Sequence, residues 1–162
     1  MTVSKITKKM IDFFDGNRKD VRHFLKVHAY AKIIGELEKL DEKTQLTLEV
    51  AAIVHDIACP LCRKKYGSSR GKNQEIEGMP LAREFLSDTG LDGDIIDRVV
   101  YLVGHHHTID MVDGVDYRIL LEADYLVNAD ESNYTAENIE NTRRVMFRTK
   151  TGTELLNSIY KV

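Results

Sequence analysis

Hydrophobic residues recur at spacings of three and four along almost the whole chain, which is the period of an amphipathic α-helix. The stretch 18–39 shows this clearly, with one apolar stripe made of Val27, Tyr30, Ile34 and Leu37. Only two prolines occur, and there is no internal repeat or Asn-Gly hairpin signal. The pattern predicts helices over residues 4–14, 18–39, 43–57, 75–88, 92–105, 117–130, 135–148 and 151–160.

The segment from Ala58 to Asn73 departs from this pattern. It is rich in glycine and serine and is long for a connection inside a compact helical domain. We therefore expect an extended loop there. Its basic residues include Lys64, Lys65, Arg70 and Lys72, which we single out as candidates for binding phosphate.

Size and charge restrict the class of protein. A chain of 162 residues suits a single domain, so we expect residues 1–162 to share one core. The net charge of −3 excludes a nucleic-acid binder driven by a basic field. No apolar run approaches the ~20 residues needed to cross a bilayer, and the N-terminus lacks a secretory signal. We expect a cytoplasmic protein in which Cys59 and Cys62 are reduced thiols.

The most apolar stretch of the chain, from Leu46 to Leu61, contains the adjacent pair His55 and Asp56. An isolated buried carboxylate costs on the order of several kcal/mol, so it is expected to be neutralised, paired with a cation or bound to a metal. Imidazole nitrogen and carboxylate oxygen are both metal ligands. One metal ion would therefore satisfy the pair, provided that other residues complete its coordination.

Two further residues lie on helical faces that point toward the predicted core. Stepping back four residues from Val27 reaches His23, and Asp124 lies on the apolar stripe of the helix predicted over 117–130. His28 is about 140° from His23 around the same helix, so the two are not expected at one site. These positions make His23 and Asp124 candidates for the missing ligands.

Each residue taken alone has a simpler interpretation. A core-facing histidine is more often hydrogen-bonded to the backbone or to a carboxylate than bound to a metal. His106 and His107, which extend the stripes of the preceding helix, could belong to a surface cluster. Asp124 would equally suit a buried ion pair with Arg22 or Arg118. The joint pattern of core-facing histidines and carboxylates favours a metal site.

The order His23, His55-Asp56, Asp124 resembles that of the HD-domain superfamily of metal-dependent phosphohydrolases. Five segments look like successive blocks of that family and cover about residues 20–131: RHFLKVHAYAKIIGELEKLD, LEVAAIVHDIACPL, KKYGSSRGKNQEIEGMPLAREFL, VVYLVGHHHT and DYRILLEADYLVNADE. In such proteins the first histidine, the His-Asp pair and the last aspartate bind one divalent metal. The resemblance therefore assigns metal binding to His23, His55, Asp56 and Asp124, and it implies a single-domain, all-α HD-type bundle with a central metal site.

One departure from the family concerns a second metal. Gln74 stands where two-metal members have a histidine, four residues before Gly78. His106 and His107, however, match the later histidines that serve the second metal in those relatives. A second site at these two histidines therefore stays open.

Another departure is Cys59, which stands where some single-metal nucleotidases of the family have a glutamate. We expect Glu75 or Glu77 to supply that acid instead. Cys59 and Cys62 form a C-x-x-C pair, but no second pair completes a structural zinc site and no βαβ pattern indicates a thioredoxin-like site. We interpret them as ordinary thiols.

The resemblance implies metal-assisted hydrolysis of a phosphate ester or phosphoanhydride, with a nucleotide as the expected substrate. Asp56 or a nearby glutamate, Glu75 or Glu77, would guide the proton of the nucleophile. His106 or His107 would stabilise developing charge or protonate the leaving oxygen. The cations expected to bind the substrate phosphate are Lys64, Lys65, Arg70, Lys72 and Arg118.

Other functions and partners stay open at this stage. A non-catalytic metal- or nucleotide-binding module is favoured by Gln74 and Cys59. A di-iron oxidase-type relative needs a full second ligand set, which Gln74 breaks. The sequence does not choose among Fe, Mn, Zn, Ni, Co and Mg, or between a monomer and a homodimer, and it predicts neither a membrane partner nor specific nucleic-acid binding.

Overall fold

The computed structural model describes residues 1–162 and contains nine α-helices and no β-strand. This confirms the all-α fold, and each of the eight predicted helices is present with its ends shifted by at most four residues. The helices are α1 (Val3–Phe13), α2 (Arg18–Leu37), α3 (Glu42–Val54), α4 (Cys59–Tyr66), α5 (Gly71–Leu86), α6 (Gly93–Val103), α7 (Val115–Glu131), α8 (Ala136–Val145) and α9 (Lys150–Tyr160).

The prediction of an extended loop from Ala58 to Asn73 is wrong, because this segment contains α4 and the start of α5. Pro60 lies in the first turn of α4, where its missing N–H removes no helix hydrogen bond. Gly67 ends the helix with a φ of 75°, a left-handed conformation that glycine adopts without steric cost. Proline and glycine here mark the two ends of a short helix, and the true connection is only residues 67–70.

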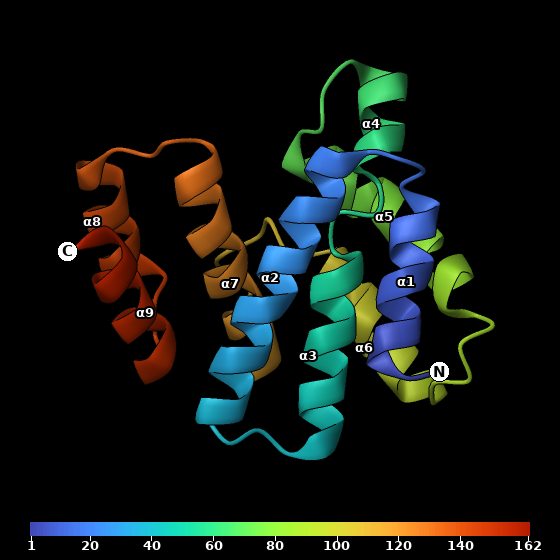
Figure 1. Cartoon of the computed structure of the whole chain (residues 1–162), viewed down its shortest axis with the longest axis horizontal. Coiled ribbons are helices and arrows are strands. Elements are labelled where there is room, and N and C mark those ends of the chain that lie inside the picture. The colour runs from blue at the N-terminus through green and yellow to red at the C-terminus, as the bar shows by residue number, and fades with distance from the viewer.

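Helix α2 lies at the centre of the bundle, between α3 and α7 (Figure 1). α1 packs on α3, α5 pairs with α6, and α8 and α9 form a hairpin beyond α7. The apolar side chains that α2 buries are Phe24, Val27, Ala31 and Ile34. Burial of a large apolar side chain contributes about 1.5–3 kcal/mol, so this face anchors α2 between its neighbours. Leu37, predicted on the same stripe, is 64% exposed because α2 ends there.

The apolar stretch around α3 is a core segment of the bundle. Contrary to the expectation from the sequence, the stretch Glu42–Tyr66 includes an 18-residue window that is long and apolar enough to cross a membrane, judged by length and composition alone. In the structure 72% of that window is buried inside the protein. A buried core helix passes the same test, so the stretch is weak evidence for a membrane span.

Candidate metal centre

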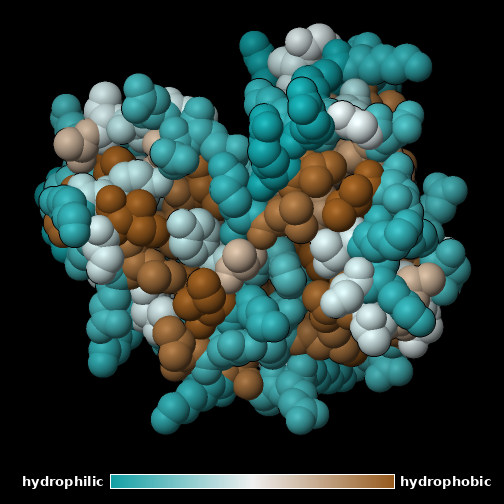
Figure 2. All heavy atoms as spheres, in the orientation of Figure 1, coloured by the Kyte–Doolittle hydropathy of each residue, from teal (hydrophilic) through white to brown (hydrophobic).

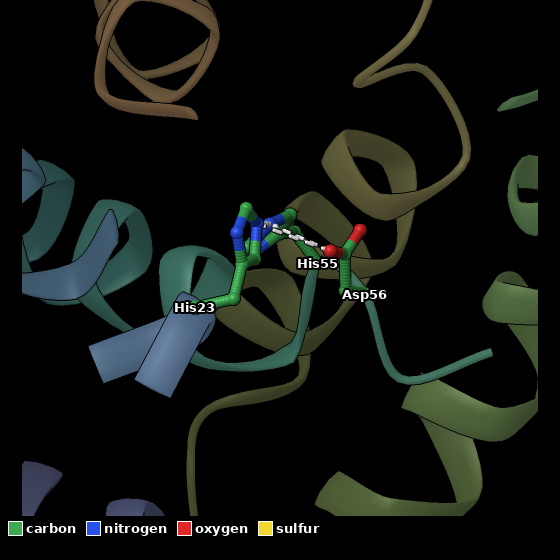
Figure 3. Close-up of side chains that lie close together, drawn as sticks. All are labelled: His23, His55 and Asp56. Atoms are coloured by element: carbon green, nitrogen blue, oxygen red, sulfur yellow. Dashed lines mark hydrogen bonds and ion pairs between the residues drawn. The ribbon is translucent and has the colours of Figure 1, made fainter. Parts of the chain in front are cut away.

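Four side chains that are distant in the sequence meet at one end of the bundle. His23 lies in the second turn of α2, His55 caps the C-terminus of α3, Asp56 follows it, and Asp124 lies in the middle of α7. Figure 3 shows the rings of His23 and His55 and the carboxylate of Asp56 turned toward one another. Because α2 packs against both α3 and α7, the core packing itself brings the four residues together.

Potential ligand atoms of these side chains form a tight group. His23 Nε2 is 3.1 Å from Asp124 Oδ1, 3.2 Å from His55 Nε2 and 3.2 Å from Asp56 Oδ2. His55 Nε2 is 3.4 Å from Asp124 Oδ1 and 3.5 Å from Asp56 Oδ2. Ligands bound about 2.0–2.2 Å from one ion lie roughly 3–3.5 Å from each other. His23, His55 and Asp56 therefore have the spacing of ligands of one metal ion, and Asp124 lies at ligand spacing from both histidines.

The far nitrogens of both histidines are hydrogen-bonded in a way that orients the rings. His55 Nδ1 donates to the carbonyl oxygen of Ala52 at 2.7 Å. His23 Nδ1 donates to Glu131 Oε1 at 2.5 Å. With the hydrogen on Nδ1, a neutral ring presents the lone pair of Nε2 to the cluster, as a metal ligand must.

The two carboxylates of the cluster carry negative charge that attracts positive charge to the site. Burial disfavours the ionised form of Asp124, but hydrogen bonds from His23 and His55 outweigh burial and hold its pKa below the ordinary value. Burial likewise opposes ionisation of Asp56, yet the charge of His55 and the nearby imidazoles of His106 and His23 lower its pKa well below the ordinary range. Burial disfavours protonation of His23, while Asp124 and Asp56 raise its pKa to about 11. Both carboxylates thus stay ionised and draw a proton onto His23; a divalent metal would supply the same positive charge and leave the ring neutral, as a ligand must be.

A second group of donors shares Asp56 with the first. The ligand atoms of Asp56, His106 and His107 lie within 4.8 Å of one another. His106 Nδ1 donates to the carbonyl of Val103 at 2.8 Å, while its Nε2 is buried, has no hydrogen-bond partner and lies 3.4 Å from Asp56 Oδ1. A buried nitrogen without a partner is uncommon in proteins. This arrangement keeps a second, incomplete metal position open.

Gln74 occupies the place where a further ligand would complete that second group. Its Oε1 accepts a hydrogen bond from His107 Nε2 at 3.0 Å, and its Nε2 donates to the carbonyl of Ser69 at 2.5 Å. Burial is the main cause that lowers the pKa of His107 to about 4. Gly71 permits the close approach of α5, since a Cβ atom there would lie 2.6 Å from His107 Cγ. Gln74 therefore orients the His107 ring by accepting a hydrogen bond from its Nε2.

A polar cavity of about 260 Å³ opens beside the cluster. It crosses the N-terminal end of α2, from α4 to the C-terminal end of α7. The notch at the top of Figure 2, between the end of α7 and α4, has hydrophilic margins. The lining residues are Lys19, Asp20, His23, Asp56, Cys59, Arg63, Ser69, Gln74, His107, Asp124, Asn128, Glu131 and Ser132.

The two glutamates expected to act as acids lie outside this lining. Glu75 Oε1 accepts hydrogen bonds from His107 N at 3.0 Å and Thr108 Oγ1 at 2.9 Å, so it holds the turn after α6. Glu77 accepts from Lys65 Nζ and from the hydroxyl of Tyr66, both at 2.6 Å. The structure thus gives Glu75 a positioning contact with His107 and directs Glu77 toward α4.

None of the five cations expected to bind phosphate lines the cavity. The basic segment is divided between α4, the connection 67–70 and α5, so its side chains point in different directions, and Arg63 of α4 lines the cavity. Lys65 is paired with Glu77, and Arg118 Nη1 donates to the carbonyl of Met146 at 2.8 Å. The remaining three residues outside the lining are Lys64, Arg70 and Lys72.

Several further residues of the cavity share a helical face with a predicted ligand. Lys19 lies four residues before His23, and Asn128 and Glu131 lie four and seven residues after Asp124. Residues at these spacings project from the same side of a helix. The helical periodicity that identifies the ligands could therefore also have identified these neighbours.

The simpler interpretations of single residues do not describe this site. The hydrogen bonds of Asp124 involve histidines, not Arg22 or Arg118. His28 is directed elsewhere and lies 3.0 Å from Glu49. The thiols of Cys59 and Cys62 are free and buried, and burial raises the pKa of Cys59, which keeps it protonated.

Comparison with known proteins places this arrangement in a family. The HD domain family matches residues 20–140. No curated protein matches the chain. The fold is similar to the crystal structure, at 1.45 Å resolution, of a predicted HD superfamily hydrolase from an uncultured Thermotogales bacterium, with a TM-score of 0.70, 21% sequence identity, and coverage of 98% of this chain and 84% of that chain. The chain belongs to the HD domain family.

Proposed function

We propose that this protein is a metal-dependent phosphohydrolase that cleaves a phosphate ester or phosphoanhydride. The observation that carries the proposal is the cluster of two histidines and two ionised carboxylates beside a polar cavity that also contains Arg63 and Lys19. A site that demands a cation, next to side chains that bind anions, suits a phosphorylated substrate. Membership of the HD domain family supports the same reaction class.

The residues that would hold the ion are His23, His55, Asp56 and Asp124. A bound divalent ion supplies Lewis acidity toward a phosphoryl oxygen and a water molecule. The protein contributes a donor set whose rings are already oriented by Glu131 and by the backbone. Preorganised donors reduce the rearrangement that binding and reaction require.

Proton transfer falls to Asp56 and His106 in this proposal. Asp56 directs Oδ2 toward His23 and Oδ1 toward His106, so one carboxylate can assist both binding and proton removal. The unpartnered Nε2 of His106 is available to stabilise charge on a leaving oxygen. His107, with a pKa of about 4, is neutral near pH 7 and suits an orienting role rather than that of an acid.

Phosphate binding falls to Arg63 and Lys19. Arg63 is paired with Asp20 at the cavity and keeps further N–H groups for a second acceptor. Lys19 adds a second positive charge on the adjoining turn of α2. We include a nucleotide as the substrate class on the strength of the family resemblance.

The test joins metal analysis with a screen for phosphate release. The purified protein is stripped with a chelator and reloaded separately with Mn²⁺, Fe²⁺, Co²⁺, Ni²⁺, Zn²⁺ or Mg²⁺. Released phosphate is then measured over nucleotides and simple phosphate esters. We expect turnover that requires the metal and is lost in His23→Ala, whereas His28→Ala, on the same helix but paired with Glu49, keeps metal and activity.

A different result would favour the non-catalytic alternative. If the protein binds metal through His23 yet releases phosphate from no substrate with any ion, it is a metal-binding module and not a hydrolase. If His28→Ala loses metal as completely as His23→Ala, the assignment of His23 as a ligand fails.

A further inference from the structure

The walls of the cavity are unusual for a site that recognises a nucleobase. Ligand pockets are mostly lined by apolar and aromatic side chains, and bases are bound by stacking on such surfaces. Here Cys59 is the one hydrophobic residue of the lining, and no Phe, Tyr, Trp, Leu, Ile or Val contributes. A base inside this cavity would lack an apolar face on which to stack.

The two sides of the cavity differ in chemistry. On the α4 side, Arg63 and the adjoining Lys19 of α2 offer positive charge to a phosphate. On the α7 side, the lining consists of the amide of Asn128, the carboxylate of Glu131 and the hydroxyl of Ser132. Amides, carboxylates and hydroxyls together can donate to and accept from alcohol groups. The metal cluster lies between these sides, since His23 belongs to α2 and Asp124 to α7.

The size of the cavity sets a further limit. Its volume of about 260 Å³ is slightly below the roughly 300–1,000 Å³ of pockets that enclose drug-sized ligands. A phosphate and a small alcohol fit this space better than a complete nucleotide. A larger substrate would leave its remaining part outside, where the cavity opens to solvent.

We propose that the cavity recognises a phosphorylated sugar through its hydroxyl groups, with the phosphate toward Arg63 and the hydroxyls toward Asn128 and Ser132. This inference rests on the proposed phosphohydrolase function and specifies the substrate class of the same site. Any base attached to the sugar lies outside the cavity and contributes little to recognition. Asn128 determines specificity, because its amide hydrogen-bonds to the hydroxyl groups of the sugar and does not take part in the reaction.

Three phosphate monoesters separate the contributions of hydroxyls and base. Ribose 5-phosphate carries the hydroxyls, pentyl phosphate has the same number of carbons without them, and AMP adds the base. One neutral hydrogen bond is worth roughly a two- to tenfold change in binding, so several hydroxyls should amount to tenfold or more. We expect kcat/KM of the metal-loaded protein to be at least tenfold higher for ribose 5-phosphate than for pentyl phosphate, and no lower than for AMP.

A matched pair of variants tests the role of the α7 side. Asn128→Leu keeps the size of the side chain and removes its hydrogen-bonding groups, so the preference for ribose 5-phosphate over pentyl phosphate should fall several-fold. Asn141→Leu, on the exposed surface of α8, should keep the wild-type preference. Melting temperature and metal content, measured for both variants, show whether each still folds and binds the ion.

The outcomes distinguish this inference from the function on which it rests. Equal kcat/KM for ribose 5-phosphate and pentyl phosphate, or a value more than tenfold higher for AMP than for ribose 5-phosphate, overturns the inference while phosphohydrolase activity stands. An unchanged preference in Asn128→Leu also overturns it. Absence of hydrolysis for every phosphate ester and anhydride tried, despite bound metal, overturns both.

Discussion

Helix α7 carries two buried carboxylates only two residues apart, and their surroundings are opposite in kind. Glu122 is fully buried, and its Oε1 accepts from the backbone N–H groups of Arg148 at 2.7 Å and Thr149 at 3.0 Å. Its Oε2 accepts from the Thr149 hydroxyl at 2.5 Å. Asp124 points to the other side of the helix, where its neighbours are the imidazole nitrogens of His23 and His55.

The two carboxylates differ in the groups that satisfy their charge. Glu122 receives three hydrogen bonds at the start of α9, and the packing is tight enough that a Cβ atom on Gly152 would lie 2.1 Å from its Oε2. Asp124 shares its neighbours His23 and His55 with a second carboxylate, Asp56, and the inward nitrogens of these rings are themselves potential ligands. A buried carboxylate whose charge is satisfied by protein donors, such as Glu122, acts as a structural anchor. A buried carboxylate that shares its histidine neighbours with another acid, such as Asp124, is suited to bind a cation.

Metal content gives the largest expected contrast between the two carboxylates. Asp124→Ala removes a proposed ligand and should weaken metal binding by more than about 100-fold, since even loss of an outer hydrogen-bond partner costs about 10–100-fold. Glu122→Gln alters a carboxylate of the same helix outside the cluster and should keep the wild-type metal content. Elemental analysis of both purified variants measures this. Equal metal content in the two would contradict the division between site and anchor.

Substitution of Arg63, on the α4 side of the cavity, should impair catalysis without reducing the metal content. Loss of a charge-assisted hydrogen bond costs about 1.5–3 kcal/mol, so Arg63→Ala should lower kcat/KM roughly 10- to 100-fold on the best phosphate ester. Lys64→Ala is the control, because Lys64 is the next residue of α4 but does not line the cavity. We expect Lys64→Ala to stay within about twofold of wild type. Similar losses in both variants would indicate that the whole basic helix attracts substrate.

Metal content should depend on Asp124, whereas thermal stability should depend on Glu122. Glu122→Ala leaves two N–H groups and one hydroxyl at the start of α9 without their acceptor, which should cost about 1–3 kcal/mol. For a chain of this size the melting temperature should fall by roughly 2–12 °C. Glu154→Ala, an exposed residue of α9 whose nearest cation is 3.9 Å away, should change stability by less than about 0.5 kcal/mol. A Glu122→Ala variant as stable as Glu154→Ala would show that these hydrogen bonds do not anchor α9.

Core-facing positions on strongly periodic helices were predictable from sequence, whereas the contacts that side chains make between helices were not. The helical period places His23 and Asp124 on core faces, and the core packing then brings them to His55 and Asp56. Arg63 escaped prediction because Pro60 and the following glycines were interpreted as loop signals, which removed the helical direction of its side chain. Gln74 shows the other limit, since only the structure reveals that it holds His107 in place of a ligand.

The pH dependence of stability tests the role of Glu122 specifically, and it is the prediction with the smallest expected effect. Burial is the main cause that raises the pKa of Glu122 above its ordinary value, although hydrogen bonds from Arg148 and Thr149 act in the opposite direction. A carboxyl whose pKa is higher in the folded protein stabilises the fold below its unfolded pKa and loses that contribution as pH rises through the folded pKa.

Wild-type protein should therefore lose stability relative to Glu122→Gln, which cannot ionise, as pH rises from about 4 to 7. Other titrating groups are common to both proteins and cancel in the difference. Denaturant unfolding of both proteins across this pH range measures the difference in the free energy of unfolding. If that difference is constant or changes in favour of wild type, the hydrogen bonds outweigh burial, and Glu122 anchors α9 as a fully ionised group.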